Sequence, residues 1–329
     1  KMKCICAKIN HRFLCRMTER NVMQQQAYFV YEKKEQEICI LRCYAKESRV
    51  VVPEEIEGLP VTEIAPYAFA ADMVKEPKNP GELPCICGEL LEELVLPGTV
   101  ERIGRYVFYN CRYFREFTFG ANIRYMGAGA FTGCKRLSKL HVRDMGQEKS
   151  CLREVLVDLN QTVTVEWLGK DGFQVLYPAF FEEAVENTPA RIIETHTHGV
   201  GIQYRNAFRN TQIDWEEYDR LFEIGRHNME PEEAGYASAY RLKSPLGLKE
   251  EAAQSYENFL REHMEKAAEL FQREGETELL RWLAEEFVHE KSELEVLMKA
   301  VSGDAAAVSM LMDISKRRFS IGKKKGFSL

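Results

Sequence analysis

The sequence lacks the patterns that mark membrane proteins and the commonest hydrolases and nucleotide-binding enzymes. None of its apolar runs approaches the ~20 residues needed to cross a bilayer. It contains no Gly-x-Ser-x-Gly nucleophile motif and no glycine-rich phosphate loop ending in Lys-Ser or Lys-Thr. It also has no Cys-x-x-Cys pair. These absences favour a soluble, non-enzymatic protein without a transmembrane segment, a cofactor or a small-molecule substrate.

Positive charge is not in excess. The 329 residues include 45 lysines and arginines against 51 aspartates and glutamates, for a formal net charge of −6. General nucleic-acid binders are usually basic, so we expect no nucleic-acid partner. We interpret a cluster of cations near the C-terminus as a solvated helix end, where the helix dipole favours positive charge, with attachment to anionic membrane or nucleic acid as the alternative. The cluster comprises Lys316, Arg317, Arg318, Lys323, Lys324 and Lys325.

Cysteine is absent from the second half of the chain. All ten cysteines lie between Cys4 and Cys151. In a chain of this length, that distribution does not resemble the disulfide framework of a small secreted domain. We therefore expect a reducing, cytoplasmic location, or the cell surface if the natural N-terminus extends beyond Lys1.

A set of apolar residues recurs every 23 positions between residues 91 and 142. A constant period at several apolar positions indicates stacked structural units, each of which buries its apolar edge against the next unit. The sequence therefore predicts a solenoid. The recurring sets are Leu91, Phe114 and Leu137; Leu94, Phe117 and Leu140; Val100 and Ile123; Ile103 and Met126; Phe108 and Phe131; and Cys111 and Cys134.

These units resemble the BspA-like bacterial leucine-rich repeat. Its pattern is roughly Leu-x-x-Ile-x-Ile-Pro-x-x-Val-x-x-Ile-Gly-x-x-Ala-Phe-x-x-Cys, and residues 94–111 and 117–134 follow it closely. Residues 50–69 follow it more loosely, so the resemblance covers about residues 45–142, with Gly120 replacing one proline. The resemblance implies a right-handed solenoid whose exposed strands bind other macromolecules, and it implies no catalysis.

The changes in periodicity divide the chain into four regions of a multidomain α and β protein. The final helices also weakly resemble an ankyrin repeat. We expect a lead-in of unclear structure (1–26), a solenoid with an N-terminal β cap (27–145), a β-rich cap or connecting region (146–210), and an all-α helical-hairpin domain with a basic tail (211–329).

Smaller elements follow from local patterns. Asp214 with Glu217, and Ser292 with Glu295, have the spacing of capping boxes at helix starts. We expect an inserted loop at 72–88; strands at 151–157, 162–168, 173–177 and 191–195; a short helix at 179–187; a loop at 196–201; and six helices within 214–315.

Six residues are expected to line the outer surface of the repeat strands. Alternate residues of a strand point to opposite faces, so Glu93 and Val95 face outward if Leu94 faces the core. Rows of such residues suit a protein or extended-peptide partner, unless the strip is only solvated or is covered by the helical region. The candidate partner-binding residues are Glu93, Val95, Glu116, Thr118, Lys139 and His141.

A metal- or thiol-dependent enzyme is the alternative function. His196 and His198 share one side of an extended segment, but a zinc site takes three or four ligands, and the sequence supplies none nearby. Cys85 and Cys87 could form a reactive thiol pair, but no adjacent basic residue would activate it. We therefore favour a non-catalytic scaffold that holds a protein partner of unknown identity, with no metal site.

Overall fold

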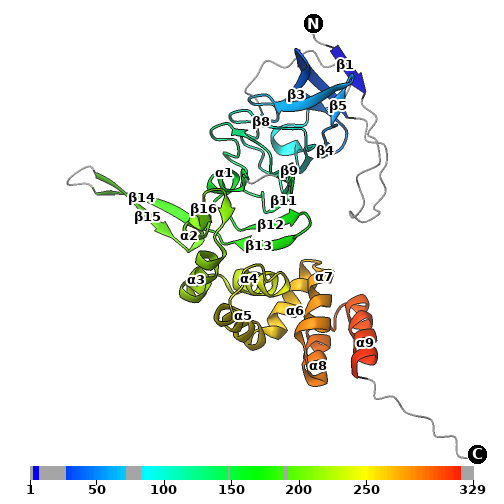
Figure 1. Ribbon diagram of the computed structural model, residues 1–329, viewed down its shortest axis with the longest axis vertical. Coiled ribbons are helices and arrows are strands. Elements are labelled where there is room, and N and C mark those ends of the chain that lie inside the picture. Colours follow the sequence, from blue (N-terminus) through cyan, green and yellow to red (C-terminus); the bar gives the residue numbers. More distant parts are fainter. Residues whose placement is uncertain (1–2, 7–26, 72–82, 147–148, 188–191, 320–329) are drawn as a thin grey trace, which may run out of the picture. The chain divides into compact units, whose positions relative to one another are not determined.

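The computed structural model describes residues 3–6, 27–71, 83–146, 149–187 and 192–319 (Figure 1). These residues form two compact units, divided between Leu221 and Phe222. Most of the predicted lead-in, most of the inserted loop and positions 320–329 of the basic tail lie outside the described residues.

The first unit is built on a solenoid of about five turns over residues 38–168. Two sheets form its sides. The first contains β4 (Arg49–Val51), β7 (Glu93–Val95), β9 (Glu116–Gly120), β11 (Lys139–Arg143) and β12 (Val163–Leu168) in parallel, with β13 (Phe173–Tyr177) antiparallel at its edge. The second contains β1 (Lys3–Cys6), β2 (Tyr28–Lys34), β3 (Glu37–Tyr44), β6 (Leu59–Ile64), β8 (Arg102–Ile103) and β10 (Tyr125–Met126), with β5 (Glu55–Ile56) paired to β6.

The strand register confirms the predicted repeat. Leu94 pairs with Phe117, which pairs with Leu140, so equivalent residues of the repeat lie side by side on β7, β9 and β11. Val50 pairs with Leu94 and Ile64 with Ile103, which makes the degenerate upstream copy the preceding coil. The solenoid fold class is therefore confirmed.

The constant spacing of the repeat reflects how closely the coils approach one another. A Cβ atom on Gly104 would lie 2.2 Å from the backbone nitrogen of Pro66, and one on Gly127 would lie 2.2 Å from that of Arg105. These positions require glycine because a neighbouring backbone occupies the space of a side chain. The buried thiol of Cys134 lies 3.1 Å from the carbonyl oxygen of Phe108, one coil earlier.

The β2–β3 hairpin caps the N-terminal end of the solenoid, as predicted. β3 pairs in parallel with β6 of the first coil. The side chain of Arg42 on β3 is buried and donates hydrogen bonds to the carbonyl oxygens of Ala68 (2.8 Å) and Ala70 (3.3 Å). These bonds satisfy turn carbonyls that would otherwise be buried without a donor.

Two predictions for residues 151–168 need correction. The expected strand at 151–157 is a helix, α1 (Leu152–Val157). Leu152, Val155 and Leu156 are buried while Val157 is exposed, which is a helical pattern that a short β-branched run conceals. The repeat also does not end at β11, because β12 pairs with it in parallel, Leu140 against Val165. These two residues are further apart in the sequence than the repeat interval, so the last coil has no echo at that interval.

The expected helix at 179–187 is instead a strand, β14 (Phe181–Asn187), paired with β15 (Ile192–His198). This two-stranded hairpin extends away from the other strands of its unit (Figure 1). His196 and His198 therefore lie in a strand and not in the expected loop. The chain continues through α2 (Gly201–Asn206), β16 (Phe208–Arg209) and β17 (Gln212–Ile213).

A buried arginine closes the C-terminal end of the solenoid unit. Arg205 on α2 has no exposed surface and donates hydrogen bonds to five backbone carbonyls. The shortest reach Leu159 (2.6 Å), Pro178 (2.6 Å) and Gln161 (2.7 Å). One guanidinium thus ties α1, α2 and the segments flanking β12 and β13 together.

Seven α-helices follow β17 in the described residues, one more than predicted. Their bounds are α3 (Trp215–Gly225), α4 (Pro231–Lys243), α5 (Glu250–Glu262), α6 (Met264–Arg273), α7 (Thr277–Trp282), α8 (Lys291–Ala300) and α9 (Ala305–Phe319), with a π-helical turn at Leu283–Phe287. The additional helix arises because α5 and α6 are divided at His263 (φ −118°, ψ 19°), although the apolar pattern of residues 248–274 is continuous. Within the described residues, no helix has the length and hydropathy of a membrane span.

One predicted capping box forms in part and the other is shifted along the chain. At the start of α3 the Asp214 carboxylate accepts a hydrogen bond from the Glu217 backbone nitrogen (3.3 Å), but the Asp214 backbone nitrogen donates to the carbonyl oxygen of Ala207 and not to Glu217. The box expected from Ser292 and Glu295 is instead formed by Glu290 and Glu293 at the start of α8. A glutamate can act as an N-cap acceptor although serine is the commoner choice.

Candidate functional site

The outer side of the first sheet brings together the six residues predicted from the sequence. Glu93, Glu116 and Lys139 pair across β7, β9 and β11 and form one row. Val95, Thr118 and His141 form a second row two positions further along the same strands. We call these two rows the outer strip.

The register extends both rows beyond the predicted residues. Arg49 joins the first row on β4, and Glu166 joins the second row on β12. The degenerate copy at 50–69 contains the signal for Arg49, because Val50 aligns with Leu94. Glu166 could not be found in this way, since the last coil departs from the 23-residue interval.

The strip is not uniformly accessible. Lys139 is exposed, the Glu116 side chain is 39% exposed, and the His141 side chain is 17% exposed. Thr118 is only 3% exposed because its short side chain lies between Val95 and His141 in the same row. The first row therefore supplies most of the surface that a partner can reach.

Charges alternate only partly along the first row. The Arg49 guanidinium lies 3.2 Å from the Glu93 carboxylate. Glu93 and Glu116 follow each other as two carboxylates, Lys139 follows as a second cation, and the uncharged Thr164 on β12 continues the row. The charged part of the row is thus a pair of adjacent acidic groups with a basic group on each side.

An imidazole between two carboxylates occupies the second row. Nδ1 of His141 lies 2.7 Å from the carboxylate of Glu166, while Nε2 lies 3.9 Å from that of Glu116, beyond hydrogen-bonding distance. Burial by itself would lower the His141 pKa, but interactions with Glu116 and Glu166 outweigh it and raise the pKa to about 9. Its interaction with His141 in turn lowers the pKa of Glu116. His141 is therefore a cation at neutral pH.

The strip carries charged side chains and an imidazole at fixed spacing. The described residues contain no group of three or more His, Cys, Asp or Glu side chains arranged to hold a metal ion. Thr118 places a hydroxyl beside His141 in the second row, but this residue is 3% exposed, so a substrate has no access to it. The strip offers carboxylates, cations and an imidazolium at fixed spacing, and such groups can bond to the side chains and backbone of a partner.

The residues of the alternative enzyme hypothesis lie elsewhere. His196 and His198 do share one face of the β14–β15 hairpin, where their Nε2 atoms lie 3.6 Å from Glu194 and 3.4 Å from Glu183 respectively. The His198 ring also stacks on Phe181, with the centroids 4.5 Å apart. His196 thus contacts a glutamate of its own strand, whereas His198 contacts residues of the facing strand, and the described residues form no convergent ligand set here.

Cys85 and Cys87 are half-buried beside the N-terminal cap. Cys85 forms an isolated β-bridge with Tyr44, and the backbone nitrogen of Ile86 donates to the carbonyl oxygen of Cys43 (2.9 Å). Backbone hydrogen bonds thus hold this segment against β3, and the two half-buried cysteines pack beside the cap.

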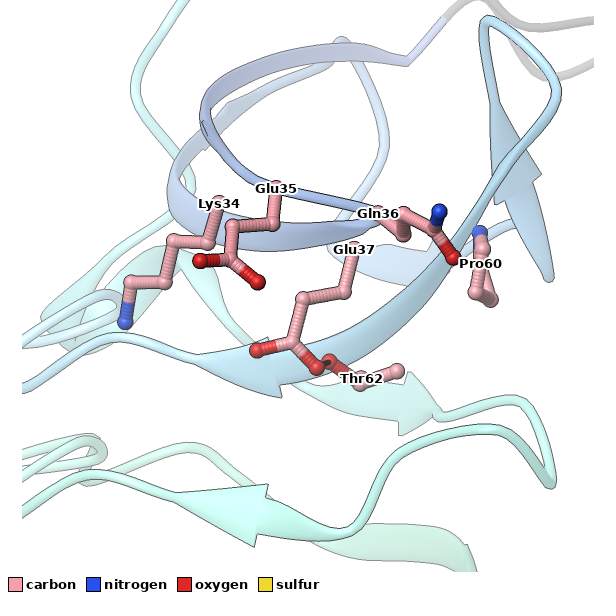
Figure 2. Close-up of a pocket in the computed structure, with 6 residues that line it drawn as sticks. All are labelled: Lys34, Glu35, Gln36, Glu37, Pro60 and Thr62. Atoms are coloured by element: carbon pink, nitrogen blue, oxygen red, sulfur yellow. Dashed lines mark hydrogen bonds between the residues drawn. The ribbon is translucent and has the colours of Figure 1, made fainter.

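A pocket of about 440 Å³ lies at the turn between β2 and β3 (Figure 2). Its lining includes Glu37, whose carboxylate accepts hydrogen bonds from Thr62 (2.8 Å) and Arg102 (2.5 Å). Lys34, also in the lining, pairs with Glu63 (2.8 Å). These bonds connect the cap hairpin with β6 and β8, so the polar groups of the pocket fasten the cap to the solenoid.

A protein-family model matches part of the solenoid. Residues 85–150 match the family described as BspA type leucine rich repeat region, with 6 copies. A crystal structure of a leucine rich cell surface protein from Faecalibacterium prausnitzii is 16% identical over 35% of this chain and 35% of that chain, with a TM-score of 0.25. The leucine rich repeat protein of T. pallidum is 25% identical over 37% of this chain and 75% of that chain, with a TM-score of 0.20.

The similarity to the first of these structures thus spans only about a third of its length. A search of curated proteins found no match. Together with the 23-residue register of β7, β9 and β11, the family match shows that residues 85–150 are a BspA-type leucine-rich repeat region, followed in this chain by a helical unit.

Proposed function

We propose that this chain is a non-catalytic scaffold that binds a protein partner through the outer strip. The observation that carries the proposal is the register of Glu93, Glu116 and Lys139, which presents one charged side chain per coil on adjacent strands. The match to a repeat family associated with protein interaction supports the same function.

Binding would depend on the order of charges along the strip. Adjacent strands lie about 4.8 Å apart, so a partner laid across them meets the carboxylates of Glu93 and Glu116 side by side. Cations of the partner would pair with these two groups, while Arg49 and Lys139 on either side of them would favour acidic groups. Complementary charge of this kind selects partners and fixes their register.

The test compares the intact chain with two triple variants. Glu93→Ala/Glu116→Ala/Lys139→Ala removes the first row, and Glu55→Ala/Glu154→Ala/Lys170→Ala makes the same charge change at exposed positions elsewhere on the unit. Partners are captured from a host-cell lysate, identified by mass spectrometry, and titrated in purified form. We expect affinity to fall at least tenfold for the strip variant and less than twofold for the control variant.

Equal affinities of a folded strip variant and the intact chain would contradict the proposal. Circular dichroism and thermal unfolding establish that each variant is folded. Capture that persists at full strength without the first row would place the partner on another surface.

We also propose a reducing, cytoplasmic compartment. The thiols of Cys39, Cys43, Cys111, Cys134 and Cys151 are free and buried, which supports a setting where thiols stay reduced. Cell fractionation with an antibody to the chain tests this proposal, and recovery on the cell surface would contradict it.

A further inference from the structure

Outward-facing residues one coil apart usually carry opposite charges in this solenoid. Glu101 lies 3.4 Å from Arg124, and Glu92 and Arg115 lie 2.5 Å apart, and the members of each pair hold equivalent positions on adjacent coils. Like charges placed directly opposite each other on neighbouring strands are destabilising, whereas opposite charges are stabilising. The repeat therefore mostly offsets charge between adjacent coils.

Two columns of residues break this pattern. Glu93 and Glu116 place like charges on adjacent strands of the outer strip, and a column of cations does so at Arg112. Glu89 lies 3.7 Å from Arg112, but the next equivalent position holds a second cation, Lys135. Arg136 lies beside Lys135, and its guanidinium carbon is 4.6 Å from the ring centroid of Tyr113, its equivalent on the preceding coil. Two adjacent coils thus bring three cations together in a chain with a net charge of −6.

Tyrosines belong to the same surface. It is formed by the turn segments that connect a strand of the second sheet with the next strand of the first sheet, such as β8 with β9. The Tyr106 ring stacks on Tyr67, with the ring centroids 5.6 Å apart and the ring planes 16° apart. Tyr109 meets Tyr106 edge to face, with the centroids 6.0 Å apart and the planes at 87°. A Cβ on Gly129 would lie 2.5 Å from the Tyr106 ring, so this ring also rests on the backbone of the next coil. We call the surface the turn face, defined by Tyr106, Tyr109, Arg112, Tyr113, Lys135 and Arg136.

The stability of the repeat does not require this composition. Arg112 and Lys135 are exposed, and Tyr113 is 40% exposed, so none of them fills the core. Placing two cations on equivalent positions of adjacent coils opposes folding. A ligand that supplies negative charge would relieve this repulsion.

We propose that the turn face binds an extended acidic segment of a protein partner. The proposal rests on the scaffold function above and adds a second surface, together with the chemistry of what it binds. Arginine and tyrosine dominate the strongest contacts of protein interfaces. Arginine also binds carboxylates through paired, charge-assisted hydrogen bonds.

The tyrosine geometry argues against single-stranded nucleic acid as the ligand. Bases bind such surfaces by stacking on open aromatic faces. One face of Tyr106 is covered by Tyr67 and another contact is made by the Gly129 backbone, while Arg136 lies over Tyr113. Carboxylates need only the cations and the polar edges of the rings.

The experiment titrates the full chain into fluorescein-labelled hexaglutamate and follows fluorescence anisotropy at low and physiological salt. We expect Arg112→Ala/Lys135→Ala/Arg136→Ala to weaken binding at least tenfold. Lys46→Ala/Arg153→Ala/Lys170→Ala removes three exposed cations elsewhere on the same unit and should weaken it less than twofold. Equal losses in the two variants would overturn the proposal, because binding would then follow net charge alone.

A single charge reversal separates binding from stability. Lys135→Glu places a carboxylate opposite Arg112, so we expect Tm to rise by about 1–2 °C while hexaglutamate binding falls. A lower Tm would show that Lys135 has a structural role and would overturn the proposal.

The remaining comparisons distinguish ligand classes and surfaces. Hexathymidylate or a heparin hexasaccharide binding more tightly than hexaglutamate would overturn the assignment of a protein segment. The Glu93→Ala/Glu116→Ala/Lys139→Ala variant should bind hexaglutamate as the intact chain does, and a comparable loss in that variant would overturn the assignment to the turn face. The outer-strip variant tests partner capture from the lysate, and the turn-face variant tests hexaglutamate binding. A negative result in one experiment therefore contradicts only the proposal for that surface.

Discussion

The solenoid and the helical unit bury their aromatic side chains against different kinds of neighbour. In the solenoid, Phe108 lies between its own equivalents, Phe69 at 5.7 Å and Phe131 at 5.2 Å. In the helical unit, Phe222 packs 4.2 Å from Tyr256, with no repeated interval between them. A core residue of the solenoid must therefore pack against the equivalent side chain on both adjacent coils. A core residue of the helical unit packs against unrelated side chains.

The glycines show the same difference. A Cβ on Gly127 would lie 2.2 Å from the backbone of the adjacent coil, but one on Gly235 in α4 would meet nothing within 4 Å. Backbone-to-backbone stacking makes glycine a requirement of the solenoid. The side chains of packed helices keep the backbones apart, so the packing of α4 does not require glycine at position 235.

The largest expected effect comes from removing the central ring of the stack. Phe108→Ala should lower the free energy of unfolding by about 3–5 kcal/mol, because a buried phenylalanine that contacts both adjacent coils leaves a cavity. Urea unfolding measured by circular dichroism checks this value. Phe108→Leu, which keeps most of the volume, should cost clearly less. A loss below about 1 kcal/mol for the alanine variant would mean that the stack contributes little.

A pair of matched glycine substitutions should separate the two units. Gly127→Ala should cost about 2–4 kcal/mol, since the new methyl group has to displace a neighbouring backbone. Gly235→Ala should instead stabilise its helix by about 0.5–1 kcal/mol. Urea unfolding of both variants makes the comparison, and similar losses at the two positions would contradict it.

His141 should make the stability of the solenoid depend on pH. Because its folded pKa of about 9 lies above the ordinary value of 6.5, its stabilising contribution is complete below pH 6.5 and is lost as pH rises through 9. At about 1.36 kcal/mol per pKa unit, and allowing for solvent screening of the two carboxylates, the contribution is about 2–3 kcal/mol. His141→Gln should therefore destabilise the chain at pH 6 by more than at pH 9.5, as measured by urea unfolding.

Titration of the His141 ring by NMR provides the direct check. Glu166→Gln removes the carboxylate 2.7 Å from Nδ1 and should lower the His141 pKa. An unchanged His141 pKa in this variant would assign the effect to other groups. An equal cost of His141→Gln at both pH values would show that the imidazole does not titrate in this range.

The smallest effect is expected in the β14–β15 hairpin. Phe181 is 57% exposed, in contrast to the buried Phe108 of the coils. Phe181→Ala should change the free energy of unfolding by no more than about 0.5 kcal/mol, because exposed substitutions remove little buried area. A loss well beyond that range in the same urea experiment would show that the hairpin is covered in solution.

The outer strip was predictable because two simple periods determine it. The 23-residue interval specifies which strands are neighbours, and strand alternation places Glu93, Glu116 and Lys139 on one face. Neither period predicts how far a side chain is buried. Thr118 is buried because the larger side chains of Val95 and His141 lie on either side of it. The binding role of the strip remains a proposal.

The sequence by itself determined the repeat, its register and the change from strands to helices. These features depend on apolar intervals that each coil must satisfy in order to bury its edge. Only the tertiary structure decided the rest: the extra coil at β12, the β14–β15 pairing, the raised pKa of His141 and the assembly of the turn face. Those features depend on which side chains meet across coils or strands, and a short segment of sequence does not carry that information.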